Sequence, residues 1–337
     1  MVNTASLADK VIELLSDKVD SNYRIAVLIV GPPGSGKSTI SEEICEEVNA
    51  RFQAYLSENQ VKVHLQDTRE SSVDICEGIP FASSSIEKIT ESEVFSHVED
   101  EGYVPHKYNS KDGATIVVGR GGLPNSIQVK HEKVKVPNDS AVRIAQIVPM
   151  DGFHLSRKCL DHFKNPLIAH QRRGSPQTFD SNNYLQLCKL LAETCEIKPH
   201  FSPSKSSSNV FDKLCASFSD AVPSIYVPGF DHSLKDPSKY QHCINAFTRV
   251  LVLEGLYLLL DVENWREIYP IMKSTDAIII CNIDIDEKVI EQRVARRHVI
   301  SGLAQSLEEG LERFRANDLL NARLIKKKQL RPMTLLP

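Results

Sequence analysis

The sequence lacks several features that would assign it to other classes of protein. Its eight cysteines include no CxxC pair, so neither a zinc site nor a redox-active dithiol is indicated. The N-terminus has no apolar segment of the secretory type. The longest apolar stretch, 250–262, is interrupted by Glu254 and Gly255 and is shorter than the roughly 20 residues that cross a bilayer. These absences predict a cytoplasmic protein with free thiols and no transmembrane segment.

Positive charge is also scarce. The formal net charge is −4, with 41% hydrophobic and 25% charged residues. A chain of 337 residues with this composition can bury a large α/β core, but it lacks the positive field that draws a protein onto nucleic acid or anionic lipid. The one basic cluster, 326–331, is typical of a solvated tail. We therefore expect no nucleic-acid partner.

Apolar runs alternate with helical patterns along the chain. The run IAVLIV at Ile25–Val30 is typical of a strand that is buried on both faces, and similar runs occur at 144–148, 250–253 and 277–280. After the first run, apolar residues recur at helical spacing over 40–52, opposite a row of glutamates. This alternation predicts an α/β fold of the doubly wound type, with a parallel sheet flanked by helices.

Three other segments add to this framework. An N-terminal amphipathic helix, capped by Thr4 and packed on the core, is predicted from Leu7, Val11, Leu14, Leu15 and Val19. Segment 59–138 has weak periodicity apart from a short strand at Thr115–Val118, so we interpret it as an insertion or small subdomain. Segment 198–209, rich in serine, is predicted to be a mobile loop. All three belong to a single predicted domain, 1–337.

A glycine-rich segment follows the first apolar run and matches the pattern GxxxxGKS. Its residues, with the threonine after them, are Gly31, Pro32, Pro33, Gly34, Ser35, Gly36, Lys37, Ser38 and Thr39. Glycines let backbone N–H groups turn toward phosphate oxygens, and the N-terminus of the next helix favours the same anion. Lys37 is then expected to reach the β and γ phosphates of ATP, and Ser38 to ligate Mg²⁺. The alternative is a glycine-rich turn whose lysine binds no phosphate.

Two other classes of nucleotide-binding protein have signals that this chain lacks. Proteins that select guanine nucleotides usually contain the sequence NKxD, which this chain lacks. Motor ATPases commonly have adjacent Asp and Glu at the end of the strand that faces Mg²⁺. Here that strand ends VLVLEG, with the single carboxylate Glu254. An unpaired carboxylate at a buried strand end is costly without a cation or a hydrogen-bond donor, and Mg²⁺ would supply the cation.

A second carboxylate, Asp151, follows the run 144–148 in the segment PMDGFH. Open α/β sheets bind ligands at the carboxyl ends of their strands. Phosphoryl transfer to an alcohol needs a carboxylate that orients the hydroxyl and accepts its proton. Asp151 is our candidate for this base, although an aspartate at this position could simply cap the next helix.

Arginines in two further segments could bind anions. Arg172 and Arg173 stand close to Phe179 and Asp180 in RRGSPQTFD, which suits an anionic or polar substrate. A solvated loop that ends in a helix cap at Asp180 is the alternative. Arg293 and Arg297, with Arg296 between them, form a cationic stripe on one predicted helix face, which could neutralise ATP phosphates or could be solvated.

Together these segments resemble the superfamily of phosphoribulokinase, uridine kinase and pantothenate kinase, and within it the fungal ATP-dependent kinases of unassigned substrate. The resemblance is carried by GPPGSGKST, PMDGFH, RRGSPQTFD, VPGFDHSLKDP, LEGLYLLL, and RVARRH with NDLLNAR, over about 23–49 and 143–323. It implies a P-loop kinase with a helical lid from RVARRH, Asp151 as base and Glu254 at the metal. The acceptor pocket it implies is lined by His154, Arg172, Arg173, Phe179, Asp180, Phe230, Asp231 and His232.

The chain departs from this superfamily in two places. The segment between Lys37 and Asp151 is longer than most members need, which affects the acceptor side. After Arg323 the chain reads LIKKKQLRPMTLLP, where related kinases would continue into another apolar strand. From the sequence we therefore expect an incomplete or differently built sheet edge near the adenine.

Two functional hypotheses follow. The first is Mg²⁺-dependent transfer of the γ-phosphoryl group of ATP to a hydroxyl of a small metabolite that is nucleoside-, sugar- or pantothenate-like. The second is an ATP-gated interaction module, in which 59–138 contacts a protein partner and kinase activity is weak or absent. The acceptor and the oligomeric state do not follow from the sequence.

Overall fold

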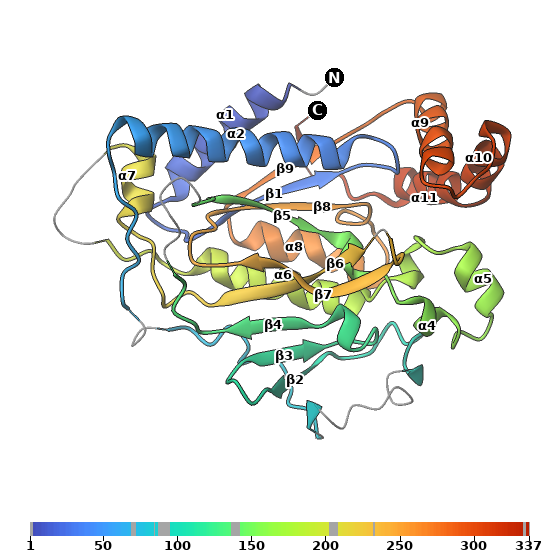
Figure 1. The fold of residues 1–337 in the computed structure, drawn as a ribbon, viewed down its shortest axis with the longest axis horizontal. Helices are drawn as coiled ribbons and strands as arrows, with labels where there is room; N and C mark the ends of the chain where they lie inside the picture. The colour runs from blue at the N-terminus through green and yellow to red at the C-terminus, as the bar shows by residue number, and fades with distance from the viewer. Residues whose placement is uncertain are drawn as a thin grey trace.

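The fold is described from a computed structural model (Figure 1). It describes residues 3–68, 72–83, 85–86, 95–135, 142–201, 208–231, 233–332 and 335–336. His232 and much of the serine-rich segment, 202–207, lie outside the described residues. None of the helices in the described part of the chain is long and apolar enough to cross a membrane.

A five-stranded parallel sheet forms the centre of the fold, in the order β10-β9-β1-β8-β5. Its strands are β1 (Ile25–Val30), β5 (Ala145–Pro149), β8 (Val250–Gly255), β9 (Ile278–Asn282) and β10 (Leu335–Leu336). Each of the four apolar runs in the sequence supplies one strand, within one or two residues of its predicted bounds. The register pairs Ile29 with Glu254 and Pro149 with Glu254. The carboxyl ends of β1, β8 and β5 therefore lie at one edge of the sheet.

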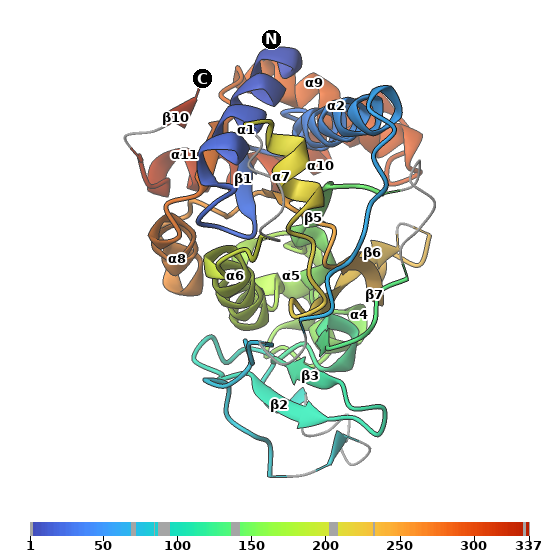
Figure 2. The same ribbon diagram turned by 90° about the vertical axis from the view of Figure 1, so that its left-hand side faces the viewer.

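Helices cover both faces of this sheet, as predicted for a doubly wound fold (Figures 1 and 2). On one face α1 (Thr4–Lys18), α2 (Lys37–Glu58) and α7 (Val210–Cys215) pack against Ile25, Val27 and Ile29. On the other face α6 (Ser181–Glu196) and α8 (Ile268–Ser274) pack against Ala26, Leu28 and Val30. Full burial of each valine, leucine or isoleucine among them contributes roughly 1.5–3 kcal/mol, which is why β1 is apolar at every position.

The N-terminal helix packs on the core as predicted, but its cap differs. α1 buries Leu7, Val11 and Leu15 against the core. The cap is Asn3, whose side chain accepts a hydrogen bond from the backbone N–H of Ser6, so the choice of Thr4 was wrong. Asparagine satisfies the free N–H groups of a first turn at least as well as threonine does.

A second, antiparallel sheet has the order β2-β3-β4-β6-β7. Segment 59–138 supplies β2 (His106–Asn109), β3 (Thr115–Val118) and β4 (Ile127–Lys130), and the later chain supplies β6 (Ser224–Asp231) and β7 (Asp236–Ile244). The predicted strand Thr115–Val118 is β3. Figure 2 shows β2 and β3 at the end of the molecule opposite α1 and α2. Because β4 pairs with β6, the long segment is joined to the rest of the protein through a shared sheet.

The C-terminal part of the chain is helical except at its end. α9 (Glu287–Ile300) is followed by α10 (Leu307–Arg313), the π-helical turn η8 (Phe314–Asp318) and α11 (Leu319–Lys328). The chain then returns to the parallel sheet, where β10 pairs with β9. The sequence predicted an incomplete or differently built sheet edge after Arg323, and the strand that lies at this edge, β10, has two residues.

Candidate active site

The phosphate loop lies between β1, which ends at Val30, and α2, which begins at Lys37. Gly34 and Gly36 have φ angles of 74° and 94°, a region that glycine adopts without strain. Gly36 is the N-cap residue of α2 and has no side-chain cap, so the first N–H groups of this helix have no side-chain partner from the cap. An anion placed before α2 would satisfy them.

Lys37 is 8% exposed, and its Nζ donates a hydrogen bond to the carbonyl oxygen of Pro32 at 3.0 Å. Burial lowers the pKa of Lys37 to about 8, while the charges of Glu254 and Asp151 oppose this shift. The Nζ of this buried lysine donates to a neutral carbonyl, so it can take closer anionic partners than these two carboxylates. The phosphates of a nucleotide would provide them, so the loop and its lysine fit the group that the sequence predicts for them.

Glu254 lies at the end of β8, where it is half-buried. Its Oε1 accepts a hydrogen bond from Ser38 Oγ at 2.7 Å. Burial raises the pKa of Glu254, and the neighbouring charge of Asp151 raises it further. A hydroxyl and a carboxylate in contact at the start of α2 are the donor types that Mg²⁺ prefers when phosphate oxygens complete its coordination. Among the described residues no group of three or more His, Cys, Asp or Glu forms a metal site by itself.

Asp151 follows β5 in the short helix η5 (Met150–Phe153), and its side chain is exposed. Its charge affects both Lys37 and Glu254. The backbone of η5 packs closely on β6, because a Cβ on Gly152 would lie only 2.0 Å from the carbonyl oxygen of Pro228. The structure therefore brings Lys37, Glu254 and Asp151 to the same sheet edge, with Asp151 facing solvent.

The predicted lid helix, α9, packs directly on the phosphate loop. A Cβ on Gly34 would lie 2.6 Å from Val294 Cγ2 and 3.1 Å from Ile290 Cγ2. The charge of Arg297 contributes to the lowered pKa of Lys37, so this arginine is close to the loop. Arg293 lies one turn earlier on α9 and is exposed. The two arginines that the sequence assigns to ATP thus belong to the helix that covers its phosphate loop.

Three of the predicted acceptor residues form a cluster beside η5. The ring of His154 lies 5.0 Å from that of Phe230, and the guanidinium carbon of Arg173 lies 5.6 Å from the Phe230 ring. His154 Nδ1 is 2.8 Å from the carbonyl oxygen of Asp151. Arg173 also donates to Asp236 Oδ1 at 2.7 Å and to the carbonyl oxygen of Leu155 at 3.0 Å. Much of its hydrogen-bonding capacity is therefore used within the protein.

Other predicted acceptor residues lie in the interior or hold a turn. Phe179 and Asp180 have no exposed surface. Phe179 packs edge-on against the rings of Tyr257 and Trp265, and Asp180 caps α6, which is the alternative that the sequence left open for it. Asp231 accepts hydrogen bonds from the backbone N–H groups of 233 and 234.

Arg172 joins the acceptor loop to the C-terminal helices. Its Nη1 donates to Asn317 Oδ1 at 2.6 Å, and its Nη2 donates to Asn321 Oδ1 at 2.9 Å. Neither asparagine was singled out from the sequence, although their spacing of four residues in NDLLNAR placed them on one helix face. Tyr257 was also missed. Its hydroxyl donates to the carbonyl oxygen of Gly174 at 2.5 Å.

Known proteins are similar to this chain over nearly its full length. No protein-family profile matches. The chain is 57% identical over 325 residues to a protein of Lachancea thermotolerans called ATP-dependent kinase YFH7, covering 95% of this chain and 93% of the relative. It is 48% identical over 337 residues to the protein of the same name from Saccharomyces cerevisiae S288c, covering 96% and 95%.

Solved structures agree with the fold. A crystal structure of YFH7 from Saccharomyces cerevisiae, described as a candidate P-loop-containing kinase with a circular permutation, superimposes with a TM-score of 0.90 at 46% identity, over 99% of this chain and 98% of that one. A candidate fructose transport system kinase from Silicibacter gives a TM-score of 0.55 at 20% identity over the whole of both chains, which shows a common fold only.

Proposed function

The chain belongs to the family of yeast ATP-dependent kinases called YFH7, and from this premise we propose that it transfers the γ-phosphoryl group of ATP to a hydroxyl group of a small metabolite. The observation that carries the proposal is the meeting of Lys37, Glu254 and Asp151 at one edge of the parallel sheet. Lys37 begins the helix after the phosphate loop, Glu254 lies near the end of β8, and Asp151 follows β5. The three side chains have the chemistry that phosphoryl transfer requires.

The phosphate loop supplies the nucleotide side of the proposed site. The backbone from Gly31 to Gly36 and the N-terminus of α2 bind the phosphates. Lys37 has a depressed pKa and gains an anionic partner when they bind. Ser38 and Glu254 would hold Mg²⁺, which would neutralise charge on the β and γ phosphates. α9 packs on the loop at Gly34 through Ile290 and Val294.

Asp151 supplies the acceptor side. Its exposed carboxylate can hydrogen-bond a substrate hydroxyl, orient its oxygen toward the γ-phosphorus, and accept the proton as the bond to phosphorus forms. The cluster of His154, Phe230 and Arg173 borders η5 and forms a wall for the acceptor. Nucleoside-like, sugar-like and pantothenate-like alcohols all remain candidate acceptors within this proposal, and a cytoplasmic location suits each of them.

The alternative of an ATP-gated interaction module has less support. Segment 59–138 supplies three strands to a sheet whose fourth strand, β6, packs against η5 beside Asp151. This segment therefore helps to position the acceptor side of a kinase site, and a protein partner is not needed to explain it. Deleting 59–138 would remove β4 from β6, so point substitutions are the better means of testing the proposal.

The test is a screen of the purified protein with Mg·ATP for ADP release over panels of nucleosides, sugars and pantothenate-like alcohols. With the best acceptor, Asp151→Asn should lower kcat by about 10²–10⁴-fold and leave ATP affinity nearly unchanged. The matched control is Asp276→Asn, because Asp276 is an exposed aspartate just before β9, at the opposite edge of the sheet. Equal turnover by wild type and Asp151→Asn would remove Asp151 from the role of base.

A further inference from the structure

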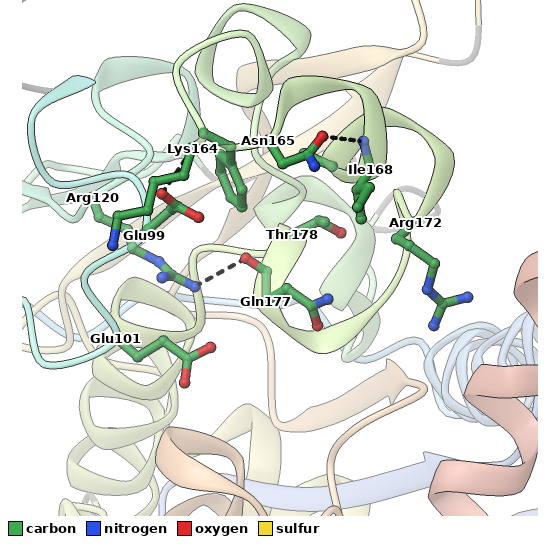
Figure 3. A pocket seen from close by; sticks show the side chains of 11 residues that line it. Glu99, Glu101, Arg120, Lys164, Asn165, Ile168, Arg172, Gln177 and Thr178 are labelled. Atoms are coloured by element: carbon green, nitrogen blue, oxygen red, sulfur yellow. Dashed lines mark hydrogen bonds between the residues drawn. The ribbon is translucent and has the colours of Figure 1, made fainter.

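A cavity of about 240 Å³ lies between segment 59–138 and the loop that carries Arg172 (Figure 3). Figure 3 shows Arg120 at one end of it and Arg172 at the other, with Gln177 and Thr178 between them. The charged and polar residues that line it include Glu99, Glu101, Arg120, Lys164, Arg172 and Thr178. Its volume is below the range of about 300–1,000 Å³ that is usual for small-molecule sites, so it suits a small group or one part of a larger molecule.

Arg120 is the unusual member of this cavity. The residue is 1% exposed, and its Nη2 donates to the carbonyl oxygens of Phe179 at 2.7 Å and Gln177 at 3.3 Å. Its Nε and Nη1 are buried and have no hydrogen-bond partner among the described residues. Burial lowers the pKa of Arg120. A buried guanidinium with two unused donor nitrogens is costly unless another group satisfies them.

The neighbouring acids do not satisfy Arg120. Asp180 is the carboxylate with the largest charge effect on it, but its oxygens accept hydrogen bonds from the backbone N–H groups of Gly121 at 2.7 Å and Asn183 at 3.1 Å. Glu99 Oε2 accepts from the backbone N–H of Lys164 at 2.9 Å. Glu101 and Asp100 also offset part of the positive charge, and Nε and Nη1 of Arg120 remain without a hydrogen-bond partner among the described residues.

The cavity adjoins the segment that carries Asp151. The carbonyl oxygen of Thr178, which lines the cavity, accepts a hydrogen bond from Leu155 N at 2.9 Å, and Asp180 N donates to the carbonyl oxygen of Phe153 at 2.7 Å. The two segments therefore run side by side. At the other end of the cavity, the charges of Arg172 and Asp151 both act on the hydroxyl of Tyr257. A small molecule in this cavity would border the acceptor side of the site.

We propose that this cavity binds an anionic group of the phosphoryl acceptor, a carboxylate or a phosphate monoester, against the guanidinium of Arg120, whose Nε and Nη1 have no hydrogen-bond partner among the described residues. Guanidinium N–H groups form strong, charge-assisted hydrogen bonds with both kinds of anion. Lys164 and Arg172 add positive charge around the same space. The proposal rests on the proposed kinase function, because it names the class of acceptor: a hydroxy acid or a phosphorylated alcohol in preference to a neutral one.

The first experiment measures binding without nucleotide, by calorimetry on the full chain. The probes are glycerol, glycerate and glycerol 3-phosphate, which share a carbon skeleton and differ in the anionic group. At least one anionic probe should bind the wild type, and glycerol should not. Arg120→Lys keeps the charge but removes the guanidinium N–H donors, so it should weaken that binding by about tenfold or more. Failure of both anionic probes to bind at millimolar concentrations would overturn the proposal.

The matched control is Arg24→Lys. Arg24 is also fully buried, donates to the carbonyl oxygens of Thr248 and Asn245, and has one nitrogen without a partner among the described residues, but it does not line this cavity. The Arg24→Lys variant should bind the anionic probe with the affinity of the wild type. If Arg120→Lys does not fold, Glu101→Gln tests the same idea, since removing a carboxylate from the cavity wall should tighten anion binding a few-fold. Unchanged binding in Glu101→Gln would contradict it.

The second experiment separates this proposal from the kinase assignment. ADP release should be faster with the anionic members of an acceptor panel, and Arg120→Lys should lose that preference while it keeps ATP binding. Lys37→Ala should lose ADP release with every acceptor but keep the anion site. If turnover is present and indifferent to the acceptor's charge, the anion proposal fails and the kinase stands. If no acceptor supports ADP release while the anion still binds, the kinase assignment fails instead, and with it the identification of the bound anion as an acceptor.

Discussion

Gly34 offers the most direct test of the packing between the phosphate loop and α9. Its φ angle is 74°, and an alanine in this left-handed region costs roughly 1–2 kcal/mol. The new Cβ would also lie 2.6 Å from Val294 Cγ2, and overpacking of a close contact costs roughly 1–3 kcal/mol. Gly34→Ala should therefore lower the free energy of unfolding by about 2–5 kcal/mol.

The control for the backbone contribution is Gly36→Ala in the same loop. Gly36 has a φ angle of 94°, and a Cβ there would have no atom within 4 Å. This variant should lose only about 1–2 kcal/mol. Urea unfolding followed by circular dichroism measures both losses, provided that the dependence on denaturant is the same for each variant. The difference between the two losses in the free energy of unfolding measures the contribution of the contact with α9.

A double-mutant cycle checks the identity of the neighbour. Val294→Ala removes Cγ2, so the double variant Gly34→Ala with Val294→Ala should be more stable than the sum of the two single losses predicts, by about 0.5–3 kcal/mol. The reasoning would be refuted if the losses simply added, or if Gly34→Ala and Gly36→Ala were equally stable. Either result would mean that α9 does not rest on the phosphate loop in solution.

Three further predictions concern the site itself. Burial lowers the pKa of Lys37 to about 8, and bound phosphates would favour its charged form. Above about pH 8, ATP binding should therefore take up a proton and weaken as the pH rises. Calorimetry in buffers of different ionisation enthalpy detects this proton uptake, and Lys37→Arg should abolish it. Glu254→Gln should raise the Mg²⁺ concentration that gives half-maximal ADP release by about 10–100-fold, whereas an unchanged magnesium dependence would contradict its assignment. Tyr257→Phe removes the hydrogen bond to Gly174 and should cost about 0.5–1.5 kcal/mol in urea unfolding, with no loss expected if the tyrosine hydroxyl is solvated.

The phosphate loop could be predicted from sequence because its determinants are local. A strand that is buried on both faces must be apolar at every position, and the loop that follows needs glycines where φ is positive. Ile25–Val30, Gly34 and Gly36 meet these conditions within a dozen residues. The placement of Glu254 beside Ser38 could be anticipated for a similar reason, because the ends of parallel strands meet at one edge of the sheet.

The acceptor side was harder to predict because proximity in a motif does not say which way a side chain points. Phe179 and Asp180 belong to the same segment as Arg172, yet they face the interior, where Asp180 caps α6. Arg173, which lies in the turn after Gln171, donates to Asp236, the first residue of β7. The sequence indicated that the segment borders a site without showing which of its side chains reach that site.

The sequence by itself determined the parallel sheet, the nucleotide loop and the two carboxylates at its edge, because periodicity, glycine positions and strand ends act over short stretches of chain. Only the tertiary structure decided the second sheet, whose strands β4 and β6 are separated by almost a hundred residues and pair through backbone groups that carry no sequence signal. It also decided the burial of Arg120, since a guanidinium can be removed from water only when distant carbonyls and carboxylates converge on it.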